Sequence, residues 1–262
     1  MTTTTPYAFH TSSFTRQQMD HLQTCLDPNT INQLGQVGVE PGWRCLEVGA
    51  GGGSIAHWLV NQVGPTGHVT ATDLRVEHLN PHPNLRILEH DISRDEVPDP
   101  GWDLIHARLV LQHLPNRRDV VAKLGRALRP GGWLVLEDFD CRRLPVVAAP
   151  DPQAAALFGR VTSAILAVLE GSGADLAWGV DTYSAMRDSG LVEVSAHAQT
   201  STWHGDTAGC LLHAVNTYQL AAPLASAGID ESTLENFRTL MQDERFAAQF
   251  YLMISTRGRH RT

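Results

Sequence analysis

The sequence predicts an α/β fold in which helices pack on both faces of a doubly wound, largely parallel sheet. Two observations indicate this fold. From Arg44 onward, short apolar runs alternate with longer stretches of helical periodicity, as successive βαβ units require. Five such runs fall between residues 44 and 137, and strands that alternate with helices form parallel sheets. The chain of 262 residues is long enough to hold this sheet in one large domain.

The predicted strands are short, as buried strands of a parallel sheet usually are. They cover Arg44–Val48, His68–Asp73, Leu85–His90, Asp103–Arg108 and Trp133–Glu137. Between the first two strands, Ser54–Val63 places its apolar residues on one helical face, and Gly64 ends that helix. A second helix is predicted over Arg118–Leu128, because Pro130-Gly131-Gly132 stops it and turns the chain into the fifth strand.

Helical patterns dominate both flanks of these strands. Residues 1–40 hold one from about Phe14 to Leu34, with an expected break at Asp27-Pro28. After the fifth strand we expect helices near 151–170, up to 189, near 207–220 and near 231–242, with strands over 191–197 and near 247–256. The chain is therefore divided into an N-terminal helical segment, 1–40, and a main domain, 41–262, with helical insertions at about 145–185 and 205–245.

The charge balance argues against a nucleic-acid partner. Twenty Lys and Arg stand against 28 Asp and Glu, which gives a net charge of −8. Proteins that bind the phosphate backbone need clustered basic residues, and here most basic groupings are only pairs, such as Arg117-Arg118. We therefore expect a small-molecule partner and no nucleic acid.

Cysteine spacing and the N-terminal sequence favour a cytoplasmic protein. The four cysteines, at 25, 45, 141 and 210, form no C-x-x-C pair, so neither a zinc site nor a disulfide framework is indicated. The start, MTTTTPYAFH, lacks the basic and apolar regions of a signal peptide. No apolar run approaches the ~20 residues that span a bilayer, so we expect no membrane association.

An acid and a run of glycines stand at the first strand-to-helix junction, in Glu47-Val48-Gly49-Ala50-Gly51-Gly52-Gly53-Ser54. Glycines there let the backbone turn tightly and approach a ligand without a Cβ clash. In an open α/β sheet such a ligand sits beyond the carboxyl ends of the strands. The glycine run alone is weak evidence, because loops use glycine freely.

Acids at the next two strand ends strengthen the prediction. Asp73 ends the second strand, where a carboxylate can accept hydrogen bonds from both hydroxyls of a ribose. Asp91-Ile92 follows the third strand, where the carboxylate could take an adenine amino group and the isoleucine could pack on the ring. The alternative, that Asp73 and Asp91 are loop acids or helix caps, stays open for each taken alone.

Two cofactors compete for this arrangement. A dinucleotide site prefers G-x-G-x-x-G/A, and counting from Gly49 the third place is Ser54. Glu47 lies inside the strand, where it would repel a pyrophosphate but could serve an ammonium or sulfonium group. S-adenosylmethionine carries both cations and no phosphate, so the register of Glu47 with the glycines favours it.

Taken together, five segments make the stretch from about Arg44 to Asp140 resemble the class I S-adenosylmethionine-dependent methyltransferases. They are LEVGAGGGS, TATD, HDI, WDLIHARLVLQHLP and LRPGGWLVLED. The resemblance is to small-molecule enzymes of the ubiquinone/menaquinone and natural-product types. It implies a Rossmann-like seven-stranded sheet whose last strand is antiparallel. It also implies a helical lid, formed by residues 1–40 and by insertions after the fifth and sixth strands.

The resemblance also implies which residues hold the cofactor. The methionine part would lie over the loop and the end of the fourth strand, and the ribose and adenine would lie at the second and third strand ends. In chain order, the implied cofactor residues are Tyr7, Glu47, Gly49, Ala50, Gly51, Asp73, Leu74, Asp91, Ile92, Ala107, Arg108 and His113. For Tyr7, expected to close over the cofactor, a mobile surface aromatic is an equal alternative.

Methyl transfer to a hydroxyl is helped by a general base that removes the hydroxyl proton, and it requires no metal. The candidate bases are Asp138, His204 and His213, with His106 on the fourth strand as a further one. A lone histidine is more often structural than catalytic, and Asp138 could instead pair with Arg142 or Arg143. No three-ligand metal pattern is evident, so we expect no metal.

The sequence thus predicts a cytoplasmic methyltransferase that uses S-adenosylmethionine to methylate a small organic molecule in secondary metabolism, with oxygen favoured over nitrogen or carbon. Three alternatives stay open: a cofactor-binding enzyme that catalyses a non-methylating cyclisation or rearrangement, a nicotinamide-dependent oxidoreductase, and a non-catalytic cofactor-binding subunit. The oligomeric state is open as well, with a homodimer among the states considered.

Overall fold

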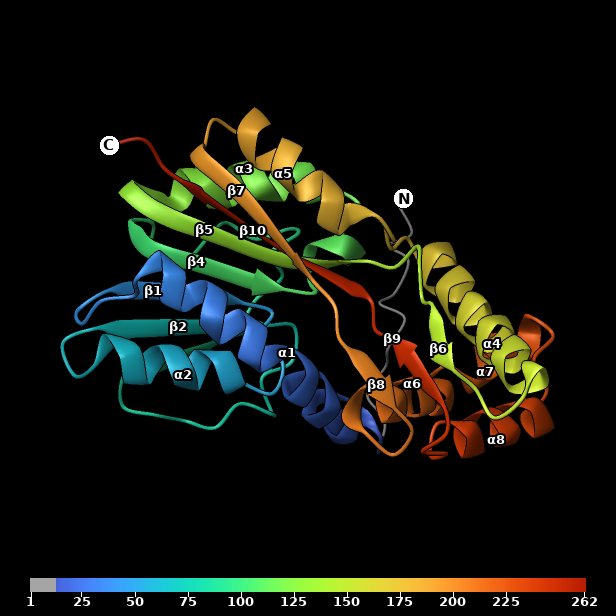
Figure 1. The fold of residues 1–262 in the computed structure, drawn as a ribbon. Coiled ribbons are helices and arrows are strands. Elements are labelled where there is room, and N and C mark those ends of the chain that lie inside the picture. Colours follow the sequence, from blue (N-terminus) through green and yellow to red (C-terminus); the bar gives the residue numbers. More distant parts are fainter. Residues whose placement is uncertain (1–12) are drawn as a thin grey trace. The chain divides into compact units, whose positions relative to one another are not determined.

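The computed structural model describes residues 13–262, which fall into two compact units (Figure 1). One, here called the sheet unit, comprises Asp27–Asp140, Ala177–Gln199 and Met253–Thr262. The other, the helical unit, comprises residues 13–26, Cys141–Leu176 and Thr200–Leu252.

The sheet unit is built on a seven-stranded sheet of order β3-β2-β1-β4-β5-β10-β7. Its strands are β1 (Arg44–Val48), β2 (His68–Asp73), β3 (Leu85–Glu89), β4 (Trp102–Arg108), β5 (Leu128–Asp140), β7 (Val192–Gln199) and β10 (Leu252–Arg259). The first five in chain order pair in parallel, and the last, β10, is antiparallel to β7. The predicted doubly wound sheet with an antiparallel last strand is confirmed.

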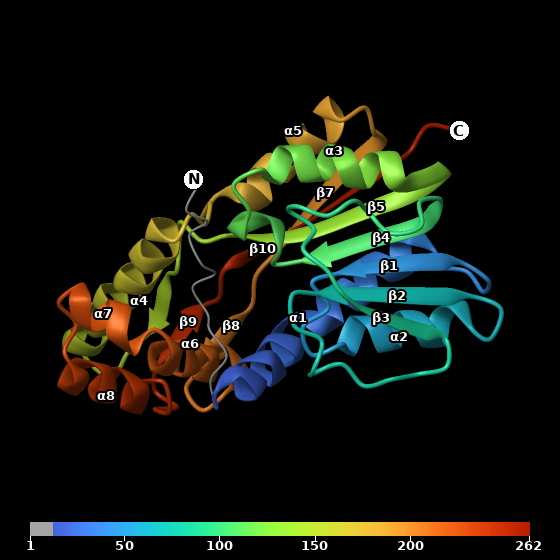
Figure 2. The same cartoon turned by 180° about the vertical axis from the view of Figure 1, so that it is seen from behind.

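Helices cover both faces of this sheet, with α1 and α2 on one side and α3 and α5 on the other (Figures 1 and 2). Their bounds are α1 (Thr15–Val37), α2 (Ser54–Val63), α3 (Arg117–Ala127) and α5 (Trp178–Asp188), and a short 3₁₀ turn, η1 (Leu111–His113), precedes α3. Successive residues of β1 point to opposite faces of the sheet. Cys45 packs with α2 on one face, whereas Leu46 packs with α3 and α5 on the other. Because helices cover both faces of the sheet, Cys45 and Leu46 are both fully buried although they point to opposite faces.

The predicted break at Asp27-Pro28 is wrong, because α1 runs unbroken through Pro28. A proline inside a helix removes one backbone hydrogen bond and strains the preceding turn. Side-chain bonds hold the helix to the sheet at this point: Asp27 pairs with Arg108, and Thr30 donates to Glu137. These contacts offset the cost of the proline.

The helical unit combines the first part of α1 and four further helices with a small antiparallel sheet of order β6-β9-β8. The four further helices are α4 (Pro152–Gly171), α6 (Ala208–Gln219), α7 (Ala221–Ser226) and α8 (Glu231–Leu240), and the strands are β6 (Val146–Ala148), β8 (Thr202–His204) and β9 (Ala247–Gln249). The sequence predicts one final strand near 247–256, but the chain forms two, β9 and β10, separated by Phe250 and Tyr251. β9 belongs to the small sheet and β10 to the seven-stranded sheet.

One helix among residues 13–262, α4, is long and apolar enough to cross a membrane by length and composition. Phe158, Val161 and Ile165 on this helix are buried in the core of the helical unit, against side chains of α6, α7 and α8. A core helix of a water-soluble unit shows the same composition, so the helix alone is weak evidence for a membrane span.

Candidate cofactor and catalytic site

The loop after β1 has a backbone that only glycine tolerates at its first position. Gly49 has a φ of +69°, and a Cβ there would lie 2.2 Å from Cγ2 of Val110. The amides of Gly49 and Ala50 both donate to the carbonyl of Thr72, at 2.8 and 3.0 Å, which turns the chain back toward β2. Gly53, with a φ of +82°, then caps the N-terminus of α2. The glycines therefore set a tight turn between β1 and α2.

Gly51 lies beside Asp73, as a shared cofactor site requires. Its amide donates to Oδ2 of Asp73 at 2.8 Å, and Oδ1 of the same carboxylate accepts the amide of Arg75 at 3.1 Å. A Cβ on Gly51 would meet no atom of residues 13–262 within 4 Å, so these residues leave this side of the loop open. Each carboxylate oxygen keeps a second lone pair, so a role in loop ordering leaves room for ribose hydroxyls.

Leu74, the next residue, leaves 54% of its surface exposed, unusual for a large apolar side chain at a strand end. A flat, apolar ring such as adenine would cover it. The residues fit S-adenosylmethionine better than a dinucleotide, because the carboxylate of Glu47, two residues before Gly49, would repel a pyrophosphate.

Asp91 at the end of β3 stabilises its own turn. Oδ1 accepts both the amide and the hydroxyl of Ser93, at 2.9 and 2.6 Å, and Oδ2 lies 3.4 Å from Nε of Arg94. Ile92 is buried in the sheet core. Asp91 therefore acts as a loop acid in this turn. The contact of Asp91 and Ile92 with adenine stays a prediction.

The fourth strand end places Ala107 in the core and Arg108 in contact with α1. Arg108 pairs with Asp27 at 2.9 Å and donates to Oγ1 of Thr30 at 2.9 Å. His113, in η1, is half-buried, and its desolvation, together with the charge of Arg117, lowers its pKa to about 4. His113 is therefore neutral near pH 7.

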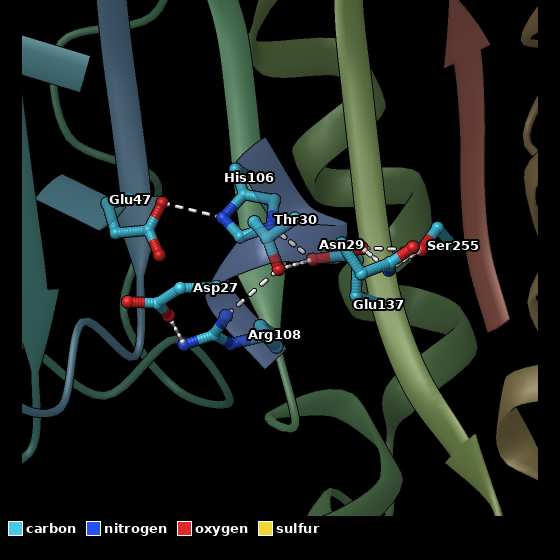
Figure 3. Close-up of polar contacts among 8 residues, drawn as sticks. All are labelled: Asp27, Asn29, Thr30, Glu47, His106, Arg108, Glu137 and Ser255. Atoms are coloured by element: carbon cyan, nitrogen blue, oxygen red, sulfur yellow. Dashed lines mark hydrogen bonds and ion pairs between the residues drawn. The ribbon is translucent and has the colours of Figure 1, made fainter. Parts of the chain in front are cut away.

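Glu47 is buried in a polar network that the sequence reveals only in part (Figure 3). His106 lies between two carboxylates, with Nδ1 2.7 Å from Glu47 and Nε2 3.3 Å from Glu137. Burial by itself would lower the pKa of His106, but the two carboxylates outweigh it and raise the pKa to about 9. A protonated imidazole has no free lone pair, so His106 is not a general base at neutral pH.

Glu137 accepts three further hydrogen bonds within this network. Thr30 and Ser255 donate their hydroxyls, and Nδ2 of Asn29 donates at 3.1 Å. Burial tends to raise the pKa of Glu137, yet the hydrogen bond and charge of His106 leave it below the ordinary value. An acid inside the apolar strand LRPGGWLVLED is the one sequence signal that could have indicated Glu137.

Asp138, the next residue of β5, is fully buried on the opposite face of the strand. Its Oδ1 lies 3.4 Å from the amide of Gln112, and its Oδ2 has no hydrogen-bond partner. This burial raises the pKa of Asp138 well above the ordinary value. The group therefore tends toward the neutral acid, which donates a proton rather than accepting one.

The two other candidate bases lie in the helical unit. His204 is exposed on β8, and its Nδ1 lies 2.8 Å from the carbonyl of Gly205. His213 is buried on α6, and its ring centroid is 5.5 Å from Phe158, 5.7 Å from Phe250 and 5.5 Å from Tyr251. Nδ1 of His213 has no hydrogen-bond partner among the described residues, and burial lowers its pKa to about 4.

Most of the predicted cofactor residues thus gather at the carboxyl edge of the parallel strands in the sheet unit. Tyr7 lies outside the described residues. Within residues 13–262, no group of three or more His, Cys, Asp and Glu could hold a metal ion.

Residues 16–206 match the family described as "Methyltransferase domain". The chain belongs to this methyltransferase family. S-adenosylmethionine is the methyl donor of class I members, and the loop, Asp73 and Leu74 fit it.

Two curated relatives each match about half of the chain. Methyltransferase str3 of Strobilurus tenacellus is 30% identical over 138 residues, which cover 52% of this chain and 50% of that protein. The ubiquinone/menaquinone biosynthesis C-methyltransferase UbiE of Cupriavidus necator is 29% identical over 126 residues, 45% of this chain and 52% of the relative. The chain therefore spans about half the length of the curated relatives it matches.

Solved structures share the fold at low identity. BH2331 of Bacillus halodurans has a TM-score of 0.58 and 19% identity, over 88% of this chain and 98% of that one. A phosphoethanolamine N-methyltransferase of Haemonchus contortus, solved with phosphomonomethylethanolamine and S-adenosylhomocysteine, has a TM-score of 0.53 and 13% identity, over 94% of this chain and 53% of that one. These likenesses support the methyltransferase fold.

Proposed function

We propose that this chain transfers the methyl group of S-adenosylmethionine to an oxygen atom of a small organic acceptor. The observation that carries the proposal is the open loop at Gly51, whose amide donates to Asp73. Leu74, the residue after Asp73, is exposed beside it in sequence. The matched relatives include one named for ubiquinone/menaquinone biosynthesis, which supports a small-molecule acceptor. The same name specifies methylation at carbon, so the choice of oxygen rests on our reasoning about the candidate bases.

The proposed cofactor site assigns one task to each strand end. Glu47 and the loop Gly49-Ala50-Gly51 would hold the methionine part, with Ala107, Arg108 and His113 beside it. Asp73 would bind the ribose and Leu74 would cover the adenine, with Asp91 and Ile92 at its far edge. When bound, S-adenosylmethionine supplies a methyl group made electrophilic by its sulfonium, and the chain's contribution is alignment and exclusion of water.

His213 is the favoured base of the three candidates. It is neutral at pH 7, since its pKa is lowered to about 4, and its Nδ1 has no partner. His204 is exposed on β8, where water competes for the reacting proton, and burial raises the pKa of Asp138, which disfavours the carboxylate that a general base needs. In this proposal, His213 accepts the proton of the acceptor hydroxyl, and the rings of Phe158 and Phe250 suit an apolar or aromatic acceptor.

The remaining parts of the proposal concern organisation. Residues 1–40, with Tyr7, and the insertions at about 145–185 and 205–245 would form a lid over the substrate. We further propose a cytoplasmic protein in secondary metabolism, without nucleic-acid or membrane partners, and with a homodimer as a state to be tested.

Two measurements test the proposal. Calorimetry should show binding of S-adenosylmethionine and S-adenosylhomocysteine but not NADH, and tight NADH binding alone would overturn it in favour of an oxidoreductase. A panel of phenols, carboxylic acids, amines and quinols, incubated with methyl-labelled donor, should then give a labelled product. Turnover of an acceptor without label transfer would instead support the non-methylating alternative.

A further inference from the structure

The network around His106 joins the cofactor strand, β1, to β4, β5 and α1. Glu47 comes from β1, His106 from β4 and Glu137 from β5, while Asn29 and Thr30 come from α1 (Figure 3). Glu47 and His106 are register partners in adjacent strands, so their side chains emerge on the same face. Glu47 stands two residues before Gly49 and thus at the base of the proposed cofactor loop.

The geometry requires a charged group at its centre. A neutral imidazole donates from one nitrogen only, whereas both nitrogens of His106 face carboxylate oxygens. The imidazole of His106 is fully buried, and so is the carboxylate of Glu137. Two carboxylates this close in a buried site cannot both stay ionised without a cation between them.

The charged groups around this site come from four elements. Glu47 on β1 and Glu137 on β5 face His106, and Arg108 on β4 pairs with Asp27 on α1 at the next position. With His106 charged, these five groups carry a net charge of −1. Without that proton the net charge is −2, and Glu47 loses the donor that fixes its carboxylate.

We propose that His106, as an imidazolium held between Glu47 and Glu137, is a positioning residue that fixes the charge and orientation of Glu47 for the cofactor. His106 does not touch the reacting atoms and acts through Glu47. The proposal rests on the proposed function, because Glu47 needs this orientation only if the loop holds the methionine part of the cofactor.

Binding of S-adenosylhomocysteine to the whole chain, measured by calorimetry between pH 6.5 and 10, tests the role of His106. In the wild type, the affinity should hold up to about pH 8.5 and fall as His106 loses its proton near pH 9. His106→Gln cannot be charged, so it should bind roughly ten-fold more weakly at pH 7, within the usual range of coupling between sites. The affinity of this variant should also not show the decrease above pH 8.5 that deprotonation of His106 causes in the wild type.

Two controls separate this role from general damage. The ligand's own amino group titrates equally in every variant, so only the difference between the pH curves reports on His106. His197→Gln, at an exposed position on β7, should keep the wild-type affinity and the wild-type pH curve. The double variant His106→Gln/Glu137→Gln restores the net charge of −1 and should regain part of the lost affinity.

Several outcomes would overturn the inference. Equal affinity and an equal pH curve for the wild type and His106→Gln would do so, and so would a double variant no better than the single one. If both variants fail to fold, ¹⁵N NMR of the wild-type histidines decides, since a neutral His106 at pH 7 contradicts the proposal and an imidazolium supports it. A wild type that binds no S-adenosylhomocysteine overturns the proposed function itself, whereas bound ligand beside a neutral His106 overturns only this inference.

Discussion

Alanine replacements at Gly49 and Gly51 separate the role of the loop after β1 in folding from its role in binding. Both have a positive φ, +69° and +53°. A Cβ on Gly49 would lie 2.2 Å from Cγ2 of Val110, whereas a Cβ on Gly51 would meet no atom within 4 Å. Replacement by alanine therefore strains the backbone at both positions but forces a side-chain clash only at Gly49.

The magnitudes follow from these two contributions. The left-handed conformation costs a residue with a Cβ about 1–2 kcal/mol, and forcing an extra methyl into a packed site costs about 1–3 kcal/mol. Gly49→Ala should therefore lower the free energy of unfolding by about 2–5 kcal/mol, and Gly51→Ala by about 1–2 kcal/mol. Gly159→Ala, inside α4 with no atom within 4 Å, is the matched control and should stabilise the chain by about 0.5–1 kcal/mol.

Denaturant unfolding followed by circular dichroism measures these changes, and calorimetry with S-adenosylhomocysteine measures binding. Gly51→Ala should fold yet lose most of its affinity for the ligand, because the added methyl occupies the open side of the loop. Wild-type affinity in Gly51→Ala would refute the assignment of this loop to the cofactor. A Gly49→Ala variant as stable as Gly51→Ala would refute the argument from the Val110 contact.

Three further predictions concern titratable residues. Asp73→Asn should weaken S-adenosylhomocysteine binding at least ten-fold, because an amide offers one acceptor oxygen instead of two; unchanged calorimetric affinity would contradict the ribose assignment. His213→Phe should abolish most of the turnover while cofactor binding persists. In the wild type, the rate should fall only as the pH drops through about 4, where His213 gains its proton. A wild-type rate independent of pH between 3.5 and 6 would argue against this base. Burial raises the pKa of Asp138, so ionisation of this carboxyl disfavours the folded state. Asp138→Asn should therefore stabilise the protein at pH 7–8 and have little effect near pH 3, as measured by thermal unfolding across pH; destabilisation at pH 8 would contradict this.

The strands from Arg44 to Asp140 could be predicted because their signal is local. Each pairs an apolar run with a helical stretch of distinct period, and the structure places β1 and β2 at the predicted residues. The small sheet of the helical unit could not be predicted in this way. Its strands β6, β8 and β9 have three residues each, too few to show an alternating pattern.

The same distinction between local and distant signals applies to the residues of the site. The loop and Asp73 are recognisable because a glycine-rich turn and a strand-end acid each leave a mark in the nearby sequence. The partners of Glu47 leave none, because His106 follows it by 59 residues. Glu137 is bonded to Thr30 and Ser255, which lie 107 and 118 residues away, so the network depends on strand order that the sequence does not display.

The central claim is that the acid–glycine loop and Asp73 bind S-adenosylmethionine for methyl transfer. Calorimetric titration of the full chain with S-adenosylhomocysteine, in parallel for the wild type and Gly51→Ala, tests it most directly. The account predicts saturable one-site binding by the wild type and a loss of at least ten-fold in the variant, which remains folded. No binding by the wild type, or equal binding by both proteins, would contradict it.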